Sequence, residues 1–383
     1  MTAGMGAGVS LGRIAGIRVR ADWSLFLIFG LIAVGLATEI FPGALPHQGA
    51  VMDWLLALIA TVLFLASLLA HELAHAVAAR RRGVTVEGIT LWLFGGLAKL
   101  HGEVATPGDE ARVSGVGPLV TVALAAASYG VAQGLSSAGA PAEVVVVPVW
   151  LAVMNGLLAA FNLLPALPLD GGRLLHSMLW KSGGDRGRAT ALAARGGVLF
   201  GVLLIAGGIL DMMTLASIEG LWLLILGWFL VGSARAEAGQ ARMGTALAGL
   251  RVADVMTSEP VVAPGWLTVD GFIGGLDRTP RHSTFPVRDF EGRIIGLVSV
   301  ASLAGVPREH RSAVRVAAVT IGMDQVVSTR PEEPLLELVQ RMRGPAQGHA
   351  LVFEDSRLVG VVSRSDILRA ARLAELKAQP LPQ

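Results

Sequence analysis

The sequence predicts a polytopic α-helical membrane protein of about six transmembrane helices, followed by a C-terminal soluble α/β domain. Two observations lead to this prediction. The 383 residues are 53% hydrophobic and only 16% charged, with a mean hydropathy of +0.62, which is typical of a chain with several membrane spans. The long apolar runs fill the first two-thirds of the chain, whereas the last third has the composition of a soluble domain and contains an internal repeat.

Charge and cysteine content exclude several classes of function. The net charge is +2, and the basic residues gather at the ends of apolar runs rather than in one patch, which argues against a nucleic acid partner. The chain has no cysteine, so a disulfide framework and a thiolate metal site are both excluded. Any metal must therefore be bound by histidines and carboxylates.

Six apolar runs are candidate membrane spans. They lie at about residues 23–39, 54–79, 112–136, 144–165, 195–212 and 217–233. Basic residues occur in every second connecting segment, beginning with the N-terminal arm, and are absent from 39–53, 136–143 and 211–219. The positive-inside rule then predicts a multi-pass protein of the cell membrane with its N-terminus and its C-terminal domain in the cytoplasm.

The second run ends in the sequence His71-Glu72-Leu73-Ala74-His75. On a helix the two histidines are separated by about one turn and leave the same face, a spacing that suits a tetrahedral zinc ion. Glu72 could take a proton from water bound to that metal. His71 lies roughly 25 Å along the helix from Trp54, at about 1.5 Å per residue, which predicts a site in the cytoplasmic half of the membrane. The alternative is a pair of histidines satisfied by neighbours in a buried helix.

Between Val84 and Leu100 the pattern changes to β-branched and aromatic residues, punctuated by Gly95-Gly96. We expect a short membrane-associated β-hairpin here. It should pack beside the helix of His71, because non-helical backbone at membrane depth must be shielded from lipid by protein or line a cavity. Two roles stay open for it. It either only packs there, or it offers an edge to which an extended peptide adds as a strand.

A third ligand is expected from the end of the fourth run. Pro165 and Pro168 break the helix there, and Asp170-Gly171-Gly172 follows on the predicted cytoplasmic side. Asp170 would complete a site of two histidines and one carboxylate with the fourth position open. Its alternative role is that of a turn residue at a helix terminus. For His176, further along, two placements stay open: contact with the site, or a position at the membrane interface.

The last third of the chain reads as a duplicated α/β unit. After an Ala/Gly-rich linker at 236–250, the segment 292–299 aligns with 356–363, which defines a first repeat at 251–307 and a second at 312–371. Each copy has the outline strand, helix, strand, strand, helix. We expect the sheets of the two copies to bury one face against each other.

With these motifs in hand, the predicted membrane domain, residues 1–235, resembles the site-2 protease family of intramembrane zinc metalloproteases over roughly residues 10–235. The zinc motif of the family is matched by 71–75, its second motif by 162–172, and weaker signatures by 95–99 and 114–119. The resemblance implies one zinc ion per chain, held by His71, His75 and Asp170. It further implies that Glu72 is the general base and that Asn162 orients the substrate or stabilises the oxyanion. The implied substrates are transmembrane proteins such as anti-sigma factors, cut within or near the lipid bilayer.

The repeat resembles a tandem pair of CBS modules, which a bacterial and archaeal subgroup of these proteases carries. Such modules often bind an adenosine nucleotide, with the ribose at a segment that the second copy matches through Ser363 and Asp366. The first copy has Ser302 in the place of the aspartate. Two roles therefore stay open for the repeat: it binds a nucleotide, or it is a pair with a purely structural or a homodimer-forming role.

The sequence thus predicts a zinc metalloendopeptidase that acts on membrane-protein substrates. The alternative is a CBS-regulated transporter or channel for a metal cation, whose path His71, His75 and Asp170 would line. A transporter needs polar residues along several spans, and the other spans are nearly uncharged.

Overall fold

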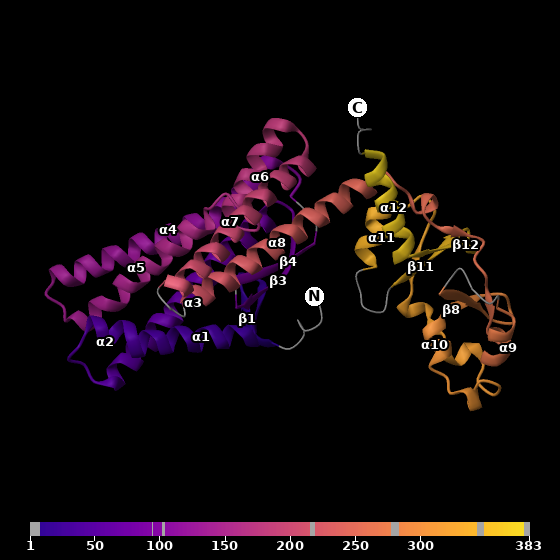
Figure 1. Cartoon of the computed structure of the whole chain (residues 1–383), viewed down its shortest axis with the longest axis horizontal. Coiled ribbons are helices and arrows are strands. Elements are labelled where there is room, and N and C mark those ends of the chain that lie inside the picture. Colours follow the sequence, from indigo (N-terminus) through magenta and orange to yellow (C-terminus); the bar gives the residue numbers. More distant parts are fainter. Residues whose placement is uncertain are drawn as a thin grey trace. The chain divides into compact units, whose positions relative to one another are not determined.

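The computed structural model describes residues 8–93, 95–101, 104–214, 219–276, 283–342 and 348–378. The chain divides into two compact units, Met1–Ala241 and Arg242–Gln383 (Figure 1). The first unit is mainly helical and the second has alternating strands and helices. The predicted fold class is confirmed: a helical membrane protein is followed by an α/β domain.

Six helical segments of the described chain are long and apolar enough to cross a membrane. The first combines α1 (Trp23–Gly35), a π-helical turn (Leu36–Ile40) and α2 (Phe41–Ala44). The others are α3 (Ala50–Arg81), α4 (Pro107–Ser137), α5 (Ala142–Asn162), α7 (Arg186–Thr214) and α8 (Glu219–Leu247). Many of their outward side chains are large and apolar, which is what a lipid environment requires.

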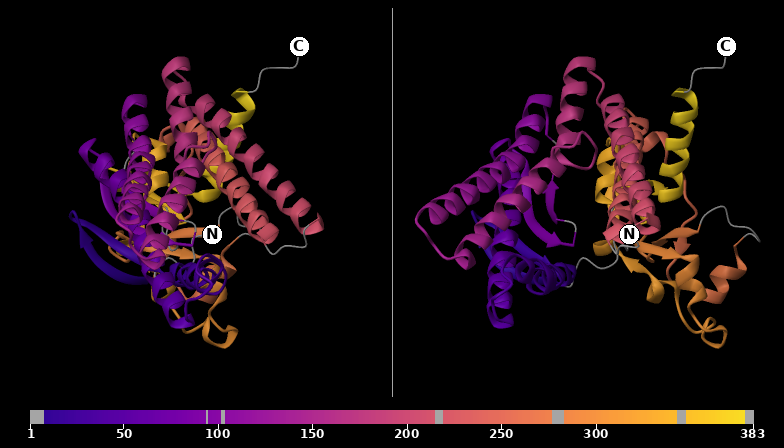
Figure 2. Two further views of the ribbon diagram at one scale, coloured as in Figure 1. Left: turned by 90° about the vertical axis from the view of Figure 1, so that its left-hand side faces the viewer. Right: turned by 60° about the vertical axis from the view of Figure 1, so that its left-hand side comes forward.

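Helix α3 lies at the centre of the first unit, where it packs against α1, α4 and α5. Helices α4 and α5 follow one another through a short turn and lie side by side (Figures 1 and 2). Small side chains such as Ala57 and Ala60 are completely buried on α3, which lets the neighbouring helices approach closely.

A four-stranded sheet covers the later turns of α3. Its order is β1 (Gly8–Ile14), β2 (Ile17–Asp22), β3 (Thr85–Trp92) and β4 (Gly95–His101), with β2 and β3 parallel and the other pairs antiparallel. The inner face of the sheet packs against Leu69, Leu73 and Ala76 of α3. The expected hairpin is present as β3 and β4, but it is half of a larger sheet to which the N-terminal arm adds two strands.

Two further segments differ from expectation. The fourth span ends at Asn162, and a separate helix, α6 (Asp170–Gly183), begins at the predicted third ligand. Helix α8 continues to Leu247, so most of the stretch expected as a linker is helical. Leu247 is 1% exposed and packs with Val252 and Leu335 of the second unit, because its side chain completes an apolar core there.

The second unit contains two four-stranded sheets. One has the order β6 (Ala263–Pro264), β7 (Thr284–Arg288), β8 (Ile294–Ser299), β9 (Ile321–Gly322), and the other β10 (Val327–Thr329), β11 (His349–Glu354), β12 (Arg357–Ser363), β5 (Thr257–Ser258). The helices are α9 (Val269–Gly274), α10 (Val300–Ala304), α11 (Leu335–Arg341) and α12 (Arg364–Ala378). Leu297 of one sheet packs with Leu351 and Val361 of the other, so the two copies bury a face against each other as expected.

Candidate metal centre

The two histidines of α3 point the same ring nitrogen toward each other. The distance between His71 Nε2 and His75 Nε2 is 3.1 Å, and the ring centroids are 4.7 Å apart. This proximity follows from the helix, because side chains four residues apart lie one above the other on one face. His71 is only 3% exposed, and His75 is half-buried.

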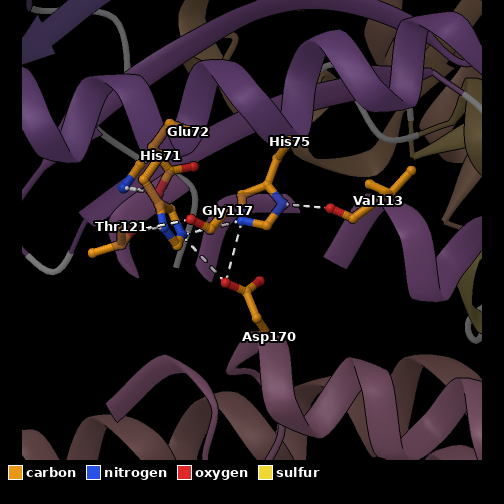
Figure 3. A network of polar contacts seen from close by, with 8 residues as sticks. His71, Glu72, His75, Val113, Gly117, Thr121 and Asp170 are labelled. Atoms are coloured by element: carbon orange, nitrogen blue, oxygen red, sulfur yellow. Dashed lines mark hydrogen bonds and ion pairs between the residues drawn. The ribbon is translucent and has the colours of Figure 1, made fainter. Parts of the chain in front are cut away.

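Asp170 reaches the histidines from the first turn of α6. Its Oδ2 atom lies 3.2 Å from Nε2 of His71 and 3.2 Å from Nε2 of His75 (Figure 3). Two glycines allow this helix to begin so close to the loop before it. A Cβ atom on Gly171 would lie 2.2 Å from the carbonyl oxygen of Leu163, and a Cβ on Gly172 would lie 2.3 Å from the carbonyl carbon of Ala166. The structure therefore brings the three predicted ligands together.

Helix α4 fixes which nitrogen of each imidazole faces the centre. His75 Nδ1 is 2.7 Å from the carbonyl oxygen of Val113, which can only accept, so this nitrogen carries the proton. His71 Nδ1 is 2.8 Å from Thr121 Oγ1, and that hydroxyl donates to the carbonyl oxygen of Gly117 at 3.0 Å. The hydroxyl therefore accepts from His71. Both Nε2 atoms are left with a lone pair directed at the centre.

The ligand atoms fit a zinc ion. Two imidazole lone pairs and a carboxylate oxygen, each 3.1 to 3.2 Å from the other two, repel one another unless a cation lies between them. A tetrahedral zinc centre with bonds of about 2.0–2.1 Å separates its ligand atoms by about 3.3 Å. The triangle thus has nearly the size that zinc requires. Histidine and carboxylate donors are also an ordinary donor set for a catalytic zinc.

Gly117 keeps α4 close to the centre. A Cβ atom at this position would lie 2.1 Å from His75 Nε2 and 2.8 Å from His71 Cε1, well inside van der Waals contact. Only a residue without a side chain lets α4 hold both Nδ1 atoms and still leave room for the imidazoles.

The carboxylate of Glu72 contacts the sheet. The backbone N–H of Gly96, at the start of β4, donates to Glu72 Oε1 at 3.0 Å. A Cβ atom on Gly96 would lie 2.3 Å from Glu72 Cδ, so a glycine is needed for this contact. The strand therefore holds the carboxylate of Glu72 on the side of the centre that faces β4.

Asn162 is the last residue of α5 and is half-buried. Within the described residues, no hydrogen bond joins its side chain to His71, His75, Glu72 or Asp170. A different asparagine, Asn155, is completely buried on α5 and donates to the carbonyl oxygen of Leu151 at 2.9 Å.

Sequence reasoning missed the groups on α4 that hold the imidazoles. Thr121 and the carbonyl of Val113 carry no signature of their own, although the segment 114–119 between them was noticed as a weak family match. His176 is a buried residue of α6. This residue is 5% exposed, and its Nδ1 lies 2.8 Å from Glu110 Oε2.

In the second unit, Ser363 and Asp366 are brought together as the cap of α12. The N–H and the hydroxyl of Ser363 donate to Asp366 Oδ2 at 3.0 and 2.6 Å, and the N–H of Asp366 donates to Ser363 Oγ at 3.2 Å. Burial lowers the pKa of nearby His349 below its usual 6.5, an effect that Asp366 opposes. The cavity beside His349 measures about 40 Å³, whereas ligand pockets usually measure about 300–1,000 Å³.

The chain is similar to known protein families and to individual proteins. The model of peptidase family M50 matches residues 59–147 and 135–204, and the CBS domain model matches 318–373. A protein of Mycobacterium tuberculosis described as a zinc metalloprotease, Rip3, is 44% identical over 376 residues, which cover 98% of this chain and 95% of the relative. A zinc metalloprotease of Methanocaldococcus jannaschii is 27% identical over 322 residues, covering 83% and 86%. The solved structure of a site-2 protease from the same archaeon is 27% identical and covers 61% of this chain and 95% of its own, with a TM-score of 0.43.

Proposed function

We propose a substrate class for this chain, which belongs to peptidase family M50, the site-2 proteases, and is therefore a zinc metalloprotease. It cuts peptide bonds within or near transmembrane segments of other membrane proteins. The observation that supports this most is the triangle of His71, His75 and Asp170, because both histidines lie on a helix that is long and apolar enough to cross a membrane. Anti-sigma factors are the substrate class we propose. Membrane proteins that accumulate as truncated intermediates in cells carrying Glu72→Ala would identify the substrates, and their absence would count against this class.

The proposed chemistry uses one bound zinc ion and side chains in three roles: metal ligand, general base and hydrogen-bond donor. His71, His75 and Asp170 would hold the ion, which supplies a Lewis acid that polarises a carbonyl and lowers the pKa of water. Glu72 accepts the proton of the attacking water and passes it to the leaving amine, while the N–H of Gly96 keeps its carboxylate in place. We assign to Asn162 a hydrogen bond to the substrate carbonyl oxygen as negative charge develops there.

A transmembrane substrate must unwind, because a helix hides its peptide bonds. The free edge of β4 is suited to hold the unwound segment. Gly96 directs its N–H to Glu72 rather than to β3, and alternate residues of a strand direct their N–H groups to the same side. The N–H of Ala98 then also faces away from β3. We propose that the substrate adds to this edge as a strand beside the base.

Ala98→Pro is therefore expected to slow cleavage by about 10-fold or more without loss of zinc, since it removes one N–H from the free edge. The measurement is the cleavage rate of a helix-destabilised transmembrane substrate at matched zinc content. Ala98→Val keeps the N–H and is the control. Equal cleavage rates for the proline and valine variants would show that the substrate does not pair with the edge of β4.

We propose that the N-terminus and the second unit lie in the cytoplasm. The alternation of basic and non-basic connecting segments supports this orientation. A chain without cysteine allows a direct test with a membrane-impermeant thiol reagent. In intact cells the reagent should label Ser137→Cys and not Ser182→Cys, and the reverse pattern would invert the topology.

Metal stoichiometry separates the protease from a cation transporter. A buried triangle of three ligand atoms is expected to retain about one zinc ion per chain through purification and dialysis, with release only by a strong chelator that also stops cleavage. Weak metal that exchanges during dialysis would favour transport.

For the second unit we propose nucleotide binding at Ser363 and Asp366. The match to the CBS domain model supports this proposal. Titration of ATP into the full chain tests it, with Asp366→Asn as the variant expected to bind more weakly. If ATP does not bind, the structural or dimerising role is the one left for the repeat.

A further inference from the structure

A second buried polar cluster joins three helices near the metal centre. His176 Nδ1 on α6 lies 2.8 Å from Glu110 Oε2 on α4, and His176 Nε2 lies 3.0 Å from Thr190 Oγ1 on α7. The hydroxyl of Thr190 in turn donates to the carbonyl oxygen of Arg186 at 2.9 Å. Glu110, His176 and Thr190 are all less than 10% exposed. None of them is a metal ligand, and the proposed chemistry uses none of them.

Because the contact between Glu110 and His176 is buried, it restricts how α4 and α6 can move relative to each other. A carboxylate out of water is costly unless it is paired, and removal of one partner of a buried pair is strongly destabilising because the other is left uncompensated. Glu110 and His176 therefore hold α4 and α6 in one relative position. The exposed ion pair of Arg173 on α6 with Glu237 on α8, at 3.4 Å, is worth much less because solvent screens it.

Glu110 belongs to the same face of α4 that holds the imidazoles. Val113, Gly117 and Thr121 follow it at helical spacings of three and four residues, so the four positions form one stripe. Val113 holds His75, Thr121 holds His71, and Gly117 provides the clearance between them. The first position of the stripe contacts the helix that begins with the third ligand, Asp170.

We propose that Glu110 and His176 are positioning residues that lock α6 to this stripe and so place Asp170 Oδ2 at the metal. Asp170 begins α6 six residues before His176, a rise of about 9 Å along a rigid helix, so a rotation of α6 displaces the carboxylate. Ligand distances in a working site vary by only about 0.2 Å. The inference rests on the proposed zinc site and adds the element that sets its third ligand.

The test compares zinc affinity in the full chain, measured by competition with a chelator, and the visible spectrum of the Co²⁺-loaded protein. Glu110→Gln and His176→Leu are expected to weaken zinc binding by about 10-fold and to alter the cobalt spectrum, since supporting groups around ligands contribute factors of this order. The exchanged double variant, Glu110→His with His176→Glu, is expected to recover most of the affinity. Glu237→Gln, which removes the exposed ion pair, is the control and should match wild type.

The results of these measurements distinguish a positioning role of the pair from a purely structural one, and both from the absence of a zinc site. Single variants that lose thermal stability yet bind zinc with wild-type affinity and spectrum would make the pair a structural contact only. Should a single variant fail to fold, Thr190→Val removes just the hydroxyl beside Nε2 and is expected to weaken zinc binding by a smaller factor. Unchanged zinc affinity in Thr190→Val, or an exchanged pair that does not recover zinc binding, would overturn the proposal. A wild type without zinc would overturn the metal site itself.

Discussion

Glu72→Gln is expected to lower the cleavage rate between about 100- and 10,000-fold while the protein keeps one zinc ion per chain. Glutamine has the shape of glutamate, and its carbonyl oxygen can still accept the hydrogen bond that Gly96 donates at 3.0 Å. It has no basic oxygen at neutral pH, so it cannot take the proton of the attacking water. Because Glu72 hydrogen-bonds to β4 and is not one of the three residues of the ligand triangle, zinc binding should be unaffected.

The measurement for Glu72→Gln is the rate constant for a helix-destabilised transmembrane substrate, with zinc determined in the same sample. Glu143→Gln, the same substitution in the first turn of α5, is the control and should cleave at the wild-type rate. If Glu72→Gln cleaves as fast as wild type at equal zinc content, another group is the base.

Gly117→Ala is expected to abolish tight zinc binding, whereas Gly115→Ala on the same helix should retain it. The added methyl at 117 would lie 2.1 Å from His75 Nε2 and 2.8 Å from His71 Cε1, so both imidazoles must turn away. At 115 the nearest atom is Leu174 Cδ2 at 3.8 Å, an ordinary contact. Both substitutions gain up to about 1 kcal/mol of helix propensity, so a loss of zinc at 117 alone cannot come from the helix itself.

Zinc per chain and the thermal unfolding midpoint, each with and without added zinc, distinguish the two glycine variants. Zinc should raise the midpoint of wild type and Gly115→Ala by mass action and leave that of Gly117→Ala unchanged. Tight zinc binding by Gly117→Ala would mean that the imidazoles bind metal in another orientation, and the ligand triangle would need revision.

The two histidines of the proposed ligand triangle could be placed side by side from the sequence because their geometry is local. Four residues on a helix bring His71 beside His75 whatever surrounds them, and the broken span before Asp170 indicated where the third ligand would enter. The groups that orient the imidazoles are different. Thr121 is separated from His71 by 50 residues along the chain. The hydroxyl of a threonine in an apolar helix usually donates a hydrogen bond to a backbone carbonyl of its own helix. Only the packing of α4 on α3 reveals its role.

The N-terminal strands could have been found. Residues 17–21 alternate buried and exposed side chains, and the preceding Ala15-Gly16 has φ values of 51° and 77°, as a tight hairpin turn requires. The glycine-rich composition of the arm concealed this pattern. Ser363 and Asp366 show the opposite difficulty. Their spacing predicts a ribose contact, yet the same spacing forms a helix cap, and a sequence does not separate the two roles.

The hydrogen bond from Gly96 has a practical consequence for any assay of this protein. The proposed base, Glu72, is held by a strand that contributes none of the proposed metal ligands, so a small displacement of β4 is expected to inactivate the molecule without releasing the ion. Metal analysis then overstates the competent fraction of a preparation, and apparent turnover numbers calculated from zinc content are too low. Concentrations of working enzyme should instead come from titration with a tight inhibitor that must contact both the ion and β4.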